Sequence, residues 1–173
     1  MILLRLRRRA IQATRFFLYA VALAVLILDQ LSKLAVLRLV PDGVSRPLWG
    51  SYLSLTVHQN TGAAFGLFAS GGLALTVLAA AVALLIAAFG PRLAAGNTAM
   101  AVGLGLSLGG ALGNFLDRLR LGHVVDFLDV HFWPVFNGAD IAITCGAILV
   151  LIGLLVDRRH CGMPPANHSG ECG

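Results

Sequence analysis

Residues 71–89 read GGLALTVLAAAVALLIAAF and carry no charged side chain. A helix needs about 20 apolar residues to cross a bilayer, so this stretch predicts a transmembrane helix. Uncharged runs at 100–116 and 141–156 have the same character, and a fourth apolar run covers about 16–32. The whole chain is 58% hydrophobic and 12% charged, whereas soluble domains are about 25% charged. We therefore expect an all-α membrane protein with four transmembrane helices.

The basic residues indicate how these helices are oriented. Basic residues favour the cytoplasmic side, and they gather before the first span, between the second and third, and after the fourth: Arg5, Arg7, Arg8, Arg9, Arg15, Arg92, Arg158 and Arg159. Both termini are therefore expected in the cytoplasm, with residues 34–70 and 117–139 outside. A smaller set in the outer segments opposes this orientation: Lys33, Arg38, Arg46, Arg118 and Arg120.

The net charge of +5 equals the five arginines at the start of the chain, so it gives no reason to expect nucleic-acid binding. A basic start followed by an apolar run also fits a secretory signal peptide. No small-residue cleavage site follows that run, and Asp29, Gln30 and Lys33 come next instead. We expect a retained signal-anchor helix.

The first outer segment has a pattern of its own. Residues 51–57 alternate between apolar and polar side chains, with Leu53, Leu55 and Val57 on one face, which predicts a half-buried strand. Pro41-Asp42-Gly43 before it is a turn signal. We expect a small extracytoplasmic β-rich segment between the first and second helices. Aromatic residues of an interfacial belt fall in the outer segments: Trp49, Tyr52, Phe127, Phe132 and Trp133.

Acidic residues cluster at the join between the third and fourth helices. Four of the eight in the chain lie within twenty-four residues: Asp117, Asp126, Asp129 and Asp140. A carboxylate near lipid is costly, so such a cluster is by default a functional-site hypothesis. Asp29, Asn60 and Asn114 reach the same membrane level in the predicted topology. This edge of the bundle is the expected site.

Asp126 and Asp140 are the expected working pair. Apolar neighbours of Asp126 limit its hydration and favour a raised pKa. Asp140 opens the fourth helix, where the simpler interpretation is an acidic residue that satisfies free backbone amides. Two partly desolvated carboxylates tend to share a proton. One then takes a proton from water while the other gives one to the substrate.

Simpler interpretations also fit the neighbouring residues. Asp117 and Arg118 are expected to form a helix-end ion pair, and Asp29 and Lys33, one turn apart, a local pair. Asn60 precedes a run of small residues that permits close approach. Asn114 and Asn137 fit either substrate carbonyl binding or bonding to helix termini.

Metal binding and cysteine chemistry receive little support. The spacing of His123, Asp126, Asp129, His131 and Asp140 matches no zinc motif. Cys145 lies within the fourth span, where we expect it to pack as a small apolar residue. Cys161 and Cys172 follow the last helix with no trusted zinc spacing. We expect no metal and no cofactor.

Five ordered motifs resemble one known family. They are Asp29-Gln30-Leu31-Ser32-Lys33, Asn60-Thr61-Gly62-Ala63-Ala64-Phe65, Gly113-Asn114 with Asp117-Arg118, Val124-Val125-Asp126-Phe127, and Phe136-Asn137 with Ala139-Asp140. On a four-helix pattern they resemble signal peptidase II, the bacterial lipoprotein signal peptidase. The similarity runs from the first helix to about residue 156. At Thr61 the motif is variable, and at Gly138 a bulkier apolar residue would equally fit the pattern.

The resemblance implies an intramembrane aspartyl endopeptidase of the bacterial inner membrane. Such an enzyme removes the signal peptide from prolipoproteins, cutting before a cysteine that carries a diacylglyceryl group. Asp126 and Asp140 match the catalytic dyad, on the outer-leaflet side. Residues that bind substrate or support the site are Asn60, Asn114, Asp117, Arg118, Asn137, Asp29 and Lys33. The same pocket is the family's target for the antibiotic globomycin.

The implied partners are prolipoproteins and membrane lipids, and the implied state is a monomer. We expect one four-helix peptidase domain over residues 1–157 and a disordered cytoplasmic tail over 158–173.

The main rival is a small transporter or proton channel, because intramembrane carboxylates also mark ion pathways. The centres of spans two to four hold nothing more polar than Thr76, Ser107 and Thr144, which disfavours that class. A structural membrane subunit leaves the acidic cluster unexplained.

Overall fold

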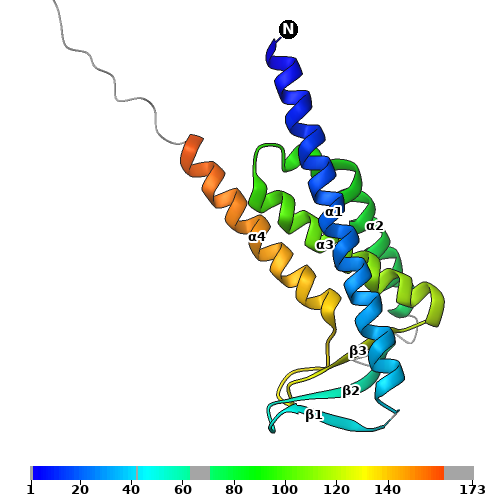
Figure 1. The fold of residues 1–173 in the computed structure, drawn as a ribbon. Coiled ribbons are helices and arrows are strands. Elements are labelled where there is room, and N and C mark those ends of the chain that lie inside the picture. Colours follow the sequence, from blue (N-terminus) through cyan, green and yellow to red (C-terminus); the bar gives the residue numbers. More distant parts are fainter. Residues whose placement is uncertain (1, 42, 63–70, 162–173) are drawn as a thin grey trace, which may run out of the picture.

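Four helices and a small sheet make up the described part of the chain (Figure 1). The computed structural model describes residues 2–41, 43–62 and 71–161. The helices are α1 (Ile2–Leu39), α2 (Gly71–Leu93), α3 (Thr98–Leu121) and α4 (Gly138–Cys161). Each contains a segment long and apolar enough to span a membrane: Ile11–Leu39, Leu73–Leu93, Thr98–Leu121 and Gly138–Val156. The predicted four-helix membrane architecture is confirmed.

The helices run further than the apolar runs predicted. α1 continues past Lys33 to Leu39, and α3 continues past Asp117 to Leu121. Charged residues are tolerated there because Lys33 and Asp117 are buried and paired with one another. α4 continues to Cys161, while the predicted tail beyond that residue lies outside the described residues.

α3 is the central helix of the bundle. Within its most apolar 18 residues 56% are buried, against 17% or less in the corresponding windows of the other three helices. Figure 1 shows α3 lying between α1, α2 and α4. Its outer neighbours present large apolar side chains such as Leu28, Leu84 and Leu151 on their exposed faces. Those faces suit contact with lipid.

Glycines allow α3 to approach its neighbours closely. Gly105 and Gly109, one turn apart, face α1, and a Cβ on Gly109 would lie 2.5 Å from the carbonyl oxygen of Ala22. On the α4 side, a Cβ on Gly146 would lie 2.5 Å from the Gly103 carbonyl oxygen. Because lipid removes the hydrophobic drive for helices to associate, close van der Waals packing at small residues holds such bundles together.

Three antiparallel strands form the sheet, in the order β1 (Ser45–Trp49), β2 (Leu53–Asn60) and β3 (Val124–Asp129). The predicted strand lies in β2. The predicted turn is present too, since the Val44 amide donates to the Pro41 carbonyl and Gly43 has a φ of 76°. β3 comes from the connection between α3 and α4 and was not predicted, because a strand buried on both faces does not alternate.

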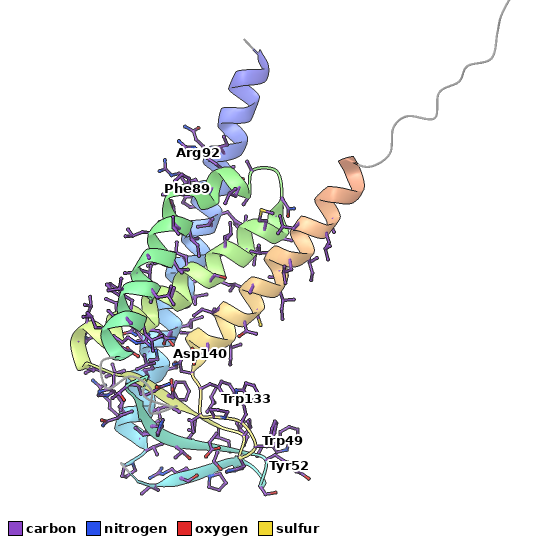
Figure 2. The ribbon with its side chains drawn as sticks, turned by 180° about the vertical axis from the view of Figure 1, so that it is seen from behind. Trp49, Tyr52, Phe89, Arg92, Trp133 and Asp140 are labelled. Atoms are coloured by element: carbon purple, nitrogen blue, oxygen red, sulfur yellow. The ribbon has the colours of Figure 1, made fainter. Side chains whose placement is uncertain are left out.

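The sheet is attached to the end of α1 by a small apolar cluster. Val36, Val40 and Phe127 are buried together, with Leu55 and Val57 packed against them. Phe127 is therefore a core residue, contrary to its predicted place in an aromatic belt. Trp49, Tyr52 and Trp133 are exposed and gather toward the far tip of the sheet (Figure 2).

Substitution of Gly109 by valine should destabilise the bundle. The new side chain would meet the α1 backbone, which cannot move aside as a flexible side chain can. Overpacking of this kind costs about 1–3 kcal/mol or more. Thermal unfolding in detergent should show a lower midpoint for Gly109→Val. Gly90→Ala is the control, because its nearest neighbour is the end of the Leu18 side chain at 3.2 Å. Equal unfolding midpoints for Gly109→Val and the unmodified chain would contradict this account of the packing.

Candidate active site

A buried polar cluster lies where the sheet meets the ends of α1, α3 and α4. The described residues include seven polar or charged side chains that are buried: Asp29, Lys33, Ser54, Asn114, Asp117, Asp126 and Asn137. Six of these were candidate site residues from the sequence. Asp126 and Asn137 are the most enclosed, with 1% and 0% of their surface exposed. The structure thus brings the predicted candidates together at one end of the bundle.

Asp126 is positioned by the sheet. β3 pairs with β2 so that Asp126 lies opposite His58 and Val124 opposite Asn60. The Asn60 side-chain amide donates to Asp126 Oδ2 at 2.9 Å, and the Asn137 amide donates to Oδ1 at 2.6 Å. Each carboxylate oxygen therefore has one fixed donor.

Burial raises the pKa of the Asp126 carboxyl above its ordinary value, as expected from its apolar neighbours. The hydrogen bonds from Asn60 and Asn137 oppose this rise because they stabilise the charged form. The charge of Asp140 adds to the rise, and that of Lys33 opposes it. Asp126 is thus an acid that the fold keeps closer to its protonated state than an exposed aspartate.

Asp140 is positioned by the first turn of α4. The Asn137 side chain accepts from the Asp140 amide at 3.0 Å, and Asp140 Oδ2 accepts from the Asn137 amide at 3.1 Å. This reciprocal pattern is a capping box. The simpler interpretation of Asp140, as a helix-start acid, is therefore correct for one of its oxygens. The other, Oδ1, accepts from the Asn114 side chain at 2.9 Å.

Asn137 links the two aspartates. Its Oδ1 caps α4 by accepting from the Asp140 amide, so its Nδ2 must point the other way, toward Asp126. The same Nδ2 lies 3.2 Å from Asn114 Oδ1. Because a backbone donor fixes which end of the side-chain amide is oxygen, the direction of the bond to Asp126 follows from the helix cap.

Lys33 joins two buried carboxylates behind this pair. Its ammonium lies 2.8 Å from Asp29 Oδ2, 2.7 Å from Asp117 Oδ2 and 3.0 Å from Asn114 Oδ1. The predicted local pair between Asp29 and Lys33 is therefore present. We call Asp29, Lys33 and Asp117 the ionic triad. Through Asn114 the triad contacts Asp140.

Backbone and side-chain donors complete the triad. Asp29 Oδ1 accepts from the Ala139 amide at 3.0 Å, and Asp117 Oδ2 accepts from the Val125 amide at 3.3 Å. Gln30 donates to Asp117 Oδ1 at 2.9 Å, a contact that was not predicted from the sequence. A side chain at position 113 would overlap the Asp29 carboxylate, so a glycine is required there. The triad thereby fixes α1, α3, β3 and α4 to one another.

The predicted ion pair between Asp117 and Arg118 is wrong. Consecutive residues point in different directions from a helix, and Asp117 faces Lys33 instead. The Arg118 guanidinium lies within electrostatic range of Asp140, Asp126 and Asp117. Its Nε is buried and has no hydrogen-bond partner. Arg118 thus has an N–H group without a hydrogen-bond partner, on a side chain within electrostatic range of Asp126 and Asp140.

The remaining acidic and histidine candidates lie elsewhere on the sheet. Asp129 Oδ1 accepts from the His131 amide at 2.8 Å, and the His131 ring lies 3.2 Å from Ser54 Oγ. Asp129 is thus a loop-stabilising residue. Across the described ranges, no three His, Cys, Asp or Glu side chains are grouped as metal ligands.

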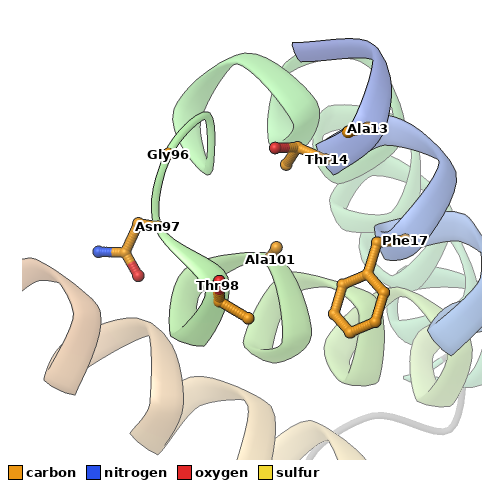
Figure 3. Close-up of a pocket in the computed structure, with 7 residues that line it drawn as sticks. All are labelled: Ala13, Thr14, Phe17, Gly96, Asn97, Thr98 and Ala101. Carbon is orange, nitrogen blue, oxygen red and sulfur yellow. The ribbon is translucent and has the colours of Figure 1, made fainter. Parts of the chain in front are cut away.

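A cavity of about 340 Å³ lies at the end of the bundle opposite the sheet (Figure 3). It is lined by α1, the α2–α3 turn and the start of α3: Ala13, Thr14, Phe17, Gly96, Asn97, Thr98 and Ala101. None of these side chains ionises. Asn97 is already occupied, since it caps α3 through the Met100 amide and donates to the Gly153 carbonyl. This cavity therefore offers no acid or base, unlike the polar cluster at the sheet end.

Comparison with known proteins identifies the family of this chain. The model of the family described as signal peptidase (SPase) II matches residues 21–156. The chain belongs to the signal peptidase II family. A lipoprotein signal peptidase of Moorella thermoacetica is 44% identical over 144 residues, covering 83% of this chain and 96% of that protein. One from Staphylococcus carnosus is 42% identical over 144 residues, covering 80% and 90%.

Solved structures share the fold of this family member. A bacterial membrane enzyme determined at 2.3 Å resolution superposes with a TM-score of 0.75 at 32% identity, covering 86% of this chain and 93% of that one. Another, determined at 1.9 Å, gives a TM-score of 0.74 at 34% identity, covering 80% and 92%. The four helices and the sheet are therefore shared with solved bacterial membrane enzymes.

Removal of the Lys33 charge should destabilise this signal peptidase. Lys33→Met leaves two carboxylates buried without their cation, a change that typically costs about 3–5 kcal/mol. Thermal unfolding in detergent should show a large fall in midpoint. Lys33→Met combined with Asp117→Asn, which removes one of the unpaired charges, should recover part of the loss. A double variant less stable than Lys33→Met would contradict the electrostatic explanation.

Proposed function

We propose that Asp126 and Asp140 are the catalytic dyad with which this peptidase removes signal peptides from prolipoproteins, cutting before a diacylglyceryl-modified cysteine. The observation that carries the proposal is the Asn137 bridge, which aligns a buried aspartate of β3 with the first turn of α4. Family membership supports the reaction. The hydrogen bonding of the two carboxylates supports the assignment of residues.

The dyad would act by general acid–base catalysis. One aspartate removes a proton from water, which attacks the scissile carbonyl, and the other protonates the carbonyl oxygen and then the departing amine. Each carboxylate oxygen has one protein donor, from Asn60, Asn137 or Asn114. These donors hold the carboxylates in place and leave each oxygen a further lone pair that can accept a hydrogen bond from water or substrate. Two neighbouring carboxylates in such a site share a proton.

Arg118 is proposed to bind the substrate backbone. Its Nε is buried without a partner, although a buried donor costs about 1–3 kcal/mol when unsatisfied. A substrate carbonyl beside the dyad would satisfy it. Asn60, Asn114 and Asn137 orient the dyad, and the ionic triad supports it through Asn114. The working unit is proposed to be a monomer.

The proposed setting is the bacterial inner membrane with the dyad toward the outer leaflet. Arg92 is exposed at the end of the bundle away from Asp140 (Figure 2). Arg15 is also exposed, and its neighbour Thr14 lines the cavity beside the α2–α3 turn at that same end. The positive-inside rule places this end in the cytoplasm. Lys33, at the sheet end, is neutralised by buried acids, so it gives little opposing signal. Both termini would then be cytoplasmic, and the exposed apolar helix faces would contact membrane lipids.

Substitution of either dyad member should abolish processing. Loss of an essential acid or base costs on the order of 10² to 10⁴ in rate, or more where the pair acts as a unit. We expect Asp126→Asn and Asp140→Asn to leave signal-peptide release from a diacylglyceryl prolipoprotein undetectable, while both variants remain in the membrane fraction. Cleavage by the unmodified enzyme should survive a chelator.

Asp129→Asn is the matched control, because Asp129 holds a loop on the same strand and does not contact the dyad. Its release rate should stay near that of the unmodified enzyme. Near-normal processing by Asp126→Asn or Asp140→Asn would refute the dyad.

Loss of the Asn60 donor should move the pH profile of cleavage upward. The Asn60 hydrogen bond lowers the pKa of Asp126, so Asn60→Ala raises that pKa further. Asp126 then stays protonated to higher pH, and whichever limb of the profile it controls shifts to higher pH. Steady-state kcat/KM measured across pH tests this. Thr61→Ala, a change at an exposed neighbour, should leave the profile in place. A shift to lower pH would exclude the assigned role of Asn60.

A further inference from the structure

Three exposed arginines at the sheet end of the bundle have no part in the site described above: Arg38, Arg46 and Arg120. The positive-inside rule disfavours basic residues on the outer side of a membrane. Lys33 and Arg118 also lie at this end, but Lys33 belongs to the ionic triad and Arg118 lies within electrostatic range of the dyad. None of the three exposed arginines makes an ion pair with a residue that the structure describes. Their presence on this side needs another explanation.

A cavity of about 220 Å³ lies between α1 and the end of α3. We call it the α1–α3 cavity. Leu31, Leu34 and Leu37 line it on α1, and Arg120 and Leu121 line it on α3. The membrane-spanning segments of these two helices end at residues 39 and 121. The α1–α3 cavity therefore lies at the level where lipid headgroups meet hydrocarbon, which is the outer leaflet in the proposed orientation.

The Arg120 guanidinium has no acidic partner inside the α1–α3 cavity. Asp117 also lines the cavity, three residues before Arg120 on α3, and oppositely charged side chains at that spacing can pair. The Asp117 carboxylate is already engaged, because Oδ1 accepts from Gln30 at 2.9 Å and Oδ2 lies 2.7 Å from the Lys33 ammonium. Arg120 therefore keeps its donors for a ligand, and the triad presents little uncompensated negative charge to that ligand.

The apolar lining of the α1–α3 cavity is open to the membrane. Leu31 is 57% exposed and Leu121 48% exposed, and both belong to spanning segments. Arg38 follows Leu34 by four residues, so the two lie on the same face of α1, with Arg38 one turn nearer the sheet. An acyl chain that lies against these leucines would carry its headgroup to the level of Arg38 and Arg120. A guanidinium binds phosphate through paired N–H donors.

We propose that the α1–α3 cavity binds a glycerophospholipid of the surrounding leaflet, with its phosphate at Arg120 and Arg38 and an acyl chain along Leu31 and Leu34. Unpaired guanidinium groups next to exposed leucines, at headgroup level, match the two chemically different parts of such a lipid. The bound lipid covers the cavity side of the ionic triad. This binding site goes beyond the proposed function and does not depend on which residues form the dyad.

Photo-cross-linking tests the location and the chemistry of the ligand. Phosphatidylglycerol with a diazirine on its acyl chain is added to the full chain in detergent and irradiated, and the labels are mapped by mass spectrometry. Labels should concentrate on peptides that contain Leu31, Leu34 and Leu121. Unlabelled phosphatidylglycerol should compete, whereas diacylglycerol, which lacks the phosphate, and glycerol 3-phosphate, which lacks the chains, should not. Labels spread evenly over α2 and α4, or equal competition by diacylglycerol, would refute the proposal.

Substitution of Arg120 tests the phosphate contact. Arg120→Gln should lower the apparent affinity of the labelled lipid about tenfold or more, the loss expected for a hydrogen bond to a charged group. Arg120→Lys keeps the charge and should retain part of the affinity. Arg46→Gln is the matched control, because it removes the same charge from an exposed position on β1, at the same end of the bundle and outside the cavity. Unchanged affinity in Arg120→Gln, or an equal loss in Arg46→Gln, would remove the assigned contact.

Thermal unfolding separates lipid binding from a purely structural role of Arg120. A ligand that binds the folded state raises the unfolding midpoint, so added phosphatidylglycerol should raise it for the unmodified chain and for Arg46→Gln, and much less for Arg120→Gln. A basic residue in the last turn of a helix also stabilises that helix end. If that were the whole role of Arg120, Arg120→Gln would lower the midpoint equally with and without lipid. An unchanged lipid-dependent rise in Arg120→Gln would therefore overturn the proposal.

Discussion

Lys33 is the residue on which the arrangement of this site depends. A buried ammonium is stable only with its charge compensated, and the carboxylates that do so come from its own helix and from α3. The same carboxylates accept backbone hydrogen bonds from α4 and β3. Separation of α1, α3, α4 and β3 would leave these charges unpaired, and the free-energy cost of unpaired buried charges opposes it. Small residues provide the close approach that the triad requires, most directly Gly113 beside Asp29.

The proposed dyad, Asp126 and Asp140, lies next to the triad on the sheet side and is held by amides instead of charges. Asn114 connects the triad to Asp140, while Asn60 and Asn137 reach Asp126 from different connections of the chain. Side-chain amides suit this position because they are neutral at every pH of interest. They orient a carboxyl group by hydrogen bonding without placing a further charge beside it. The raised pKa of Asp126 reflects this balance, since burial outweighs its two amide donors.

Much of the fold follows from local pattern, because composition decides which segments enter a membrane. The four spans and the strand of β2 were predicted in this way. β3 was missed because Val124, Val125, Asp126 and Phe127 are all buried, and a strand enclosed on both faces has no alternation. The ends of α1 and α3 were placed too early because hydropathy treats Lys33 and Asp117 as breaks, whereas each neutralises the other.

The candidate site, like the fold, was predicted in part: its residues were identified, but some of their contacts were not. Residue types near the membrane edge were sufficient to nominate Asp126, Asp140 and the three asparagines. Partners were not predictable where they are distant in sequence. Asp117 was paired with adjacent Arg118, but its actual partner is eighty-four positions away on α1. Proximity along a chain is a poor guide to contacts in a bundle, where each helix face meets a different neighbour.

The capping box at α4 has a consequence for when the enzyme becomes active. Asn137 cannot orient Asp126 unless its carbonyl oxygen is engaged by the Asp140 amide, and that bond exists only when the first turn of α4 is wound. Completion of the helix end and alignment of the proposed dyad are therefore the same event. A chain still entering the bilayer carries both aspartates but no aligned pair, so on this proposal its hydrolytic activity waits for the last helix to pack against the rest of the protein.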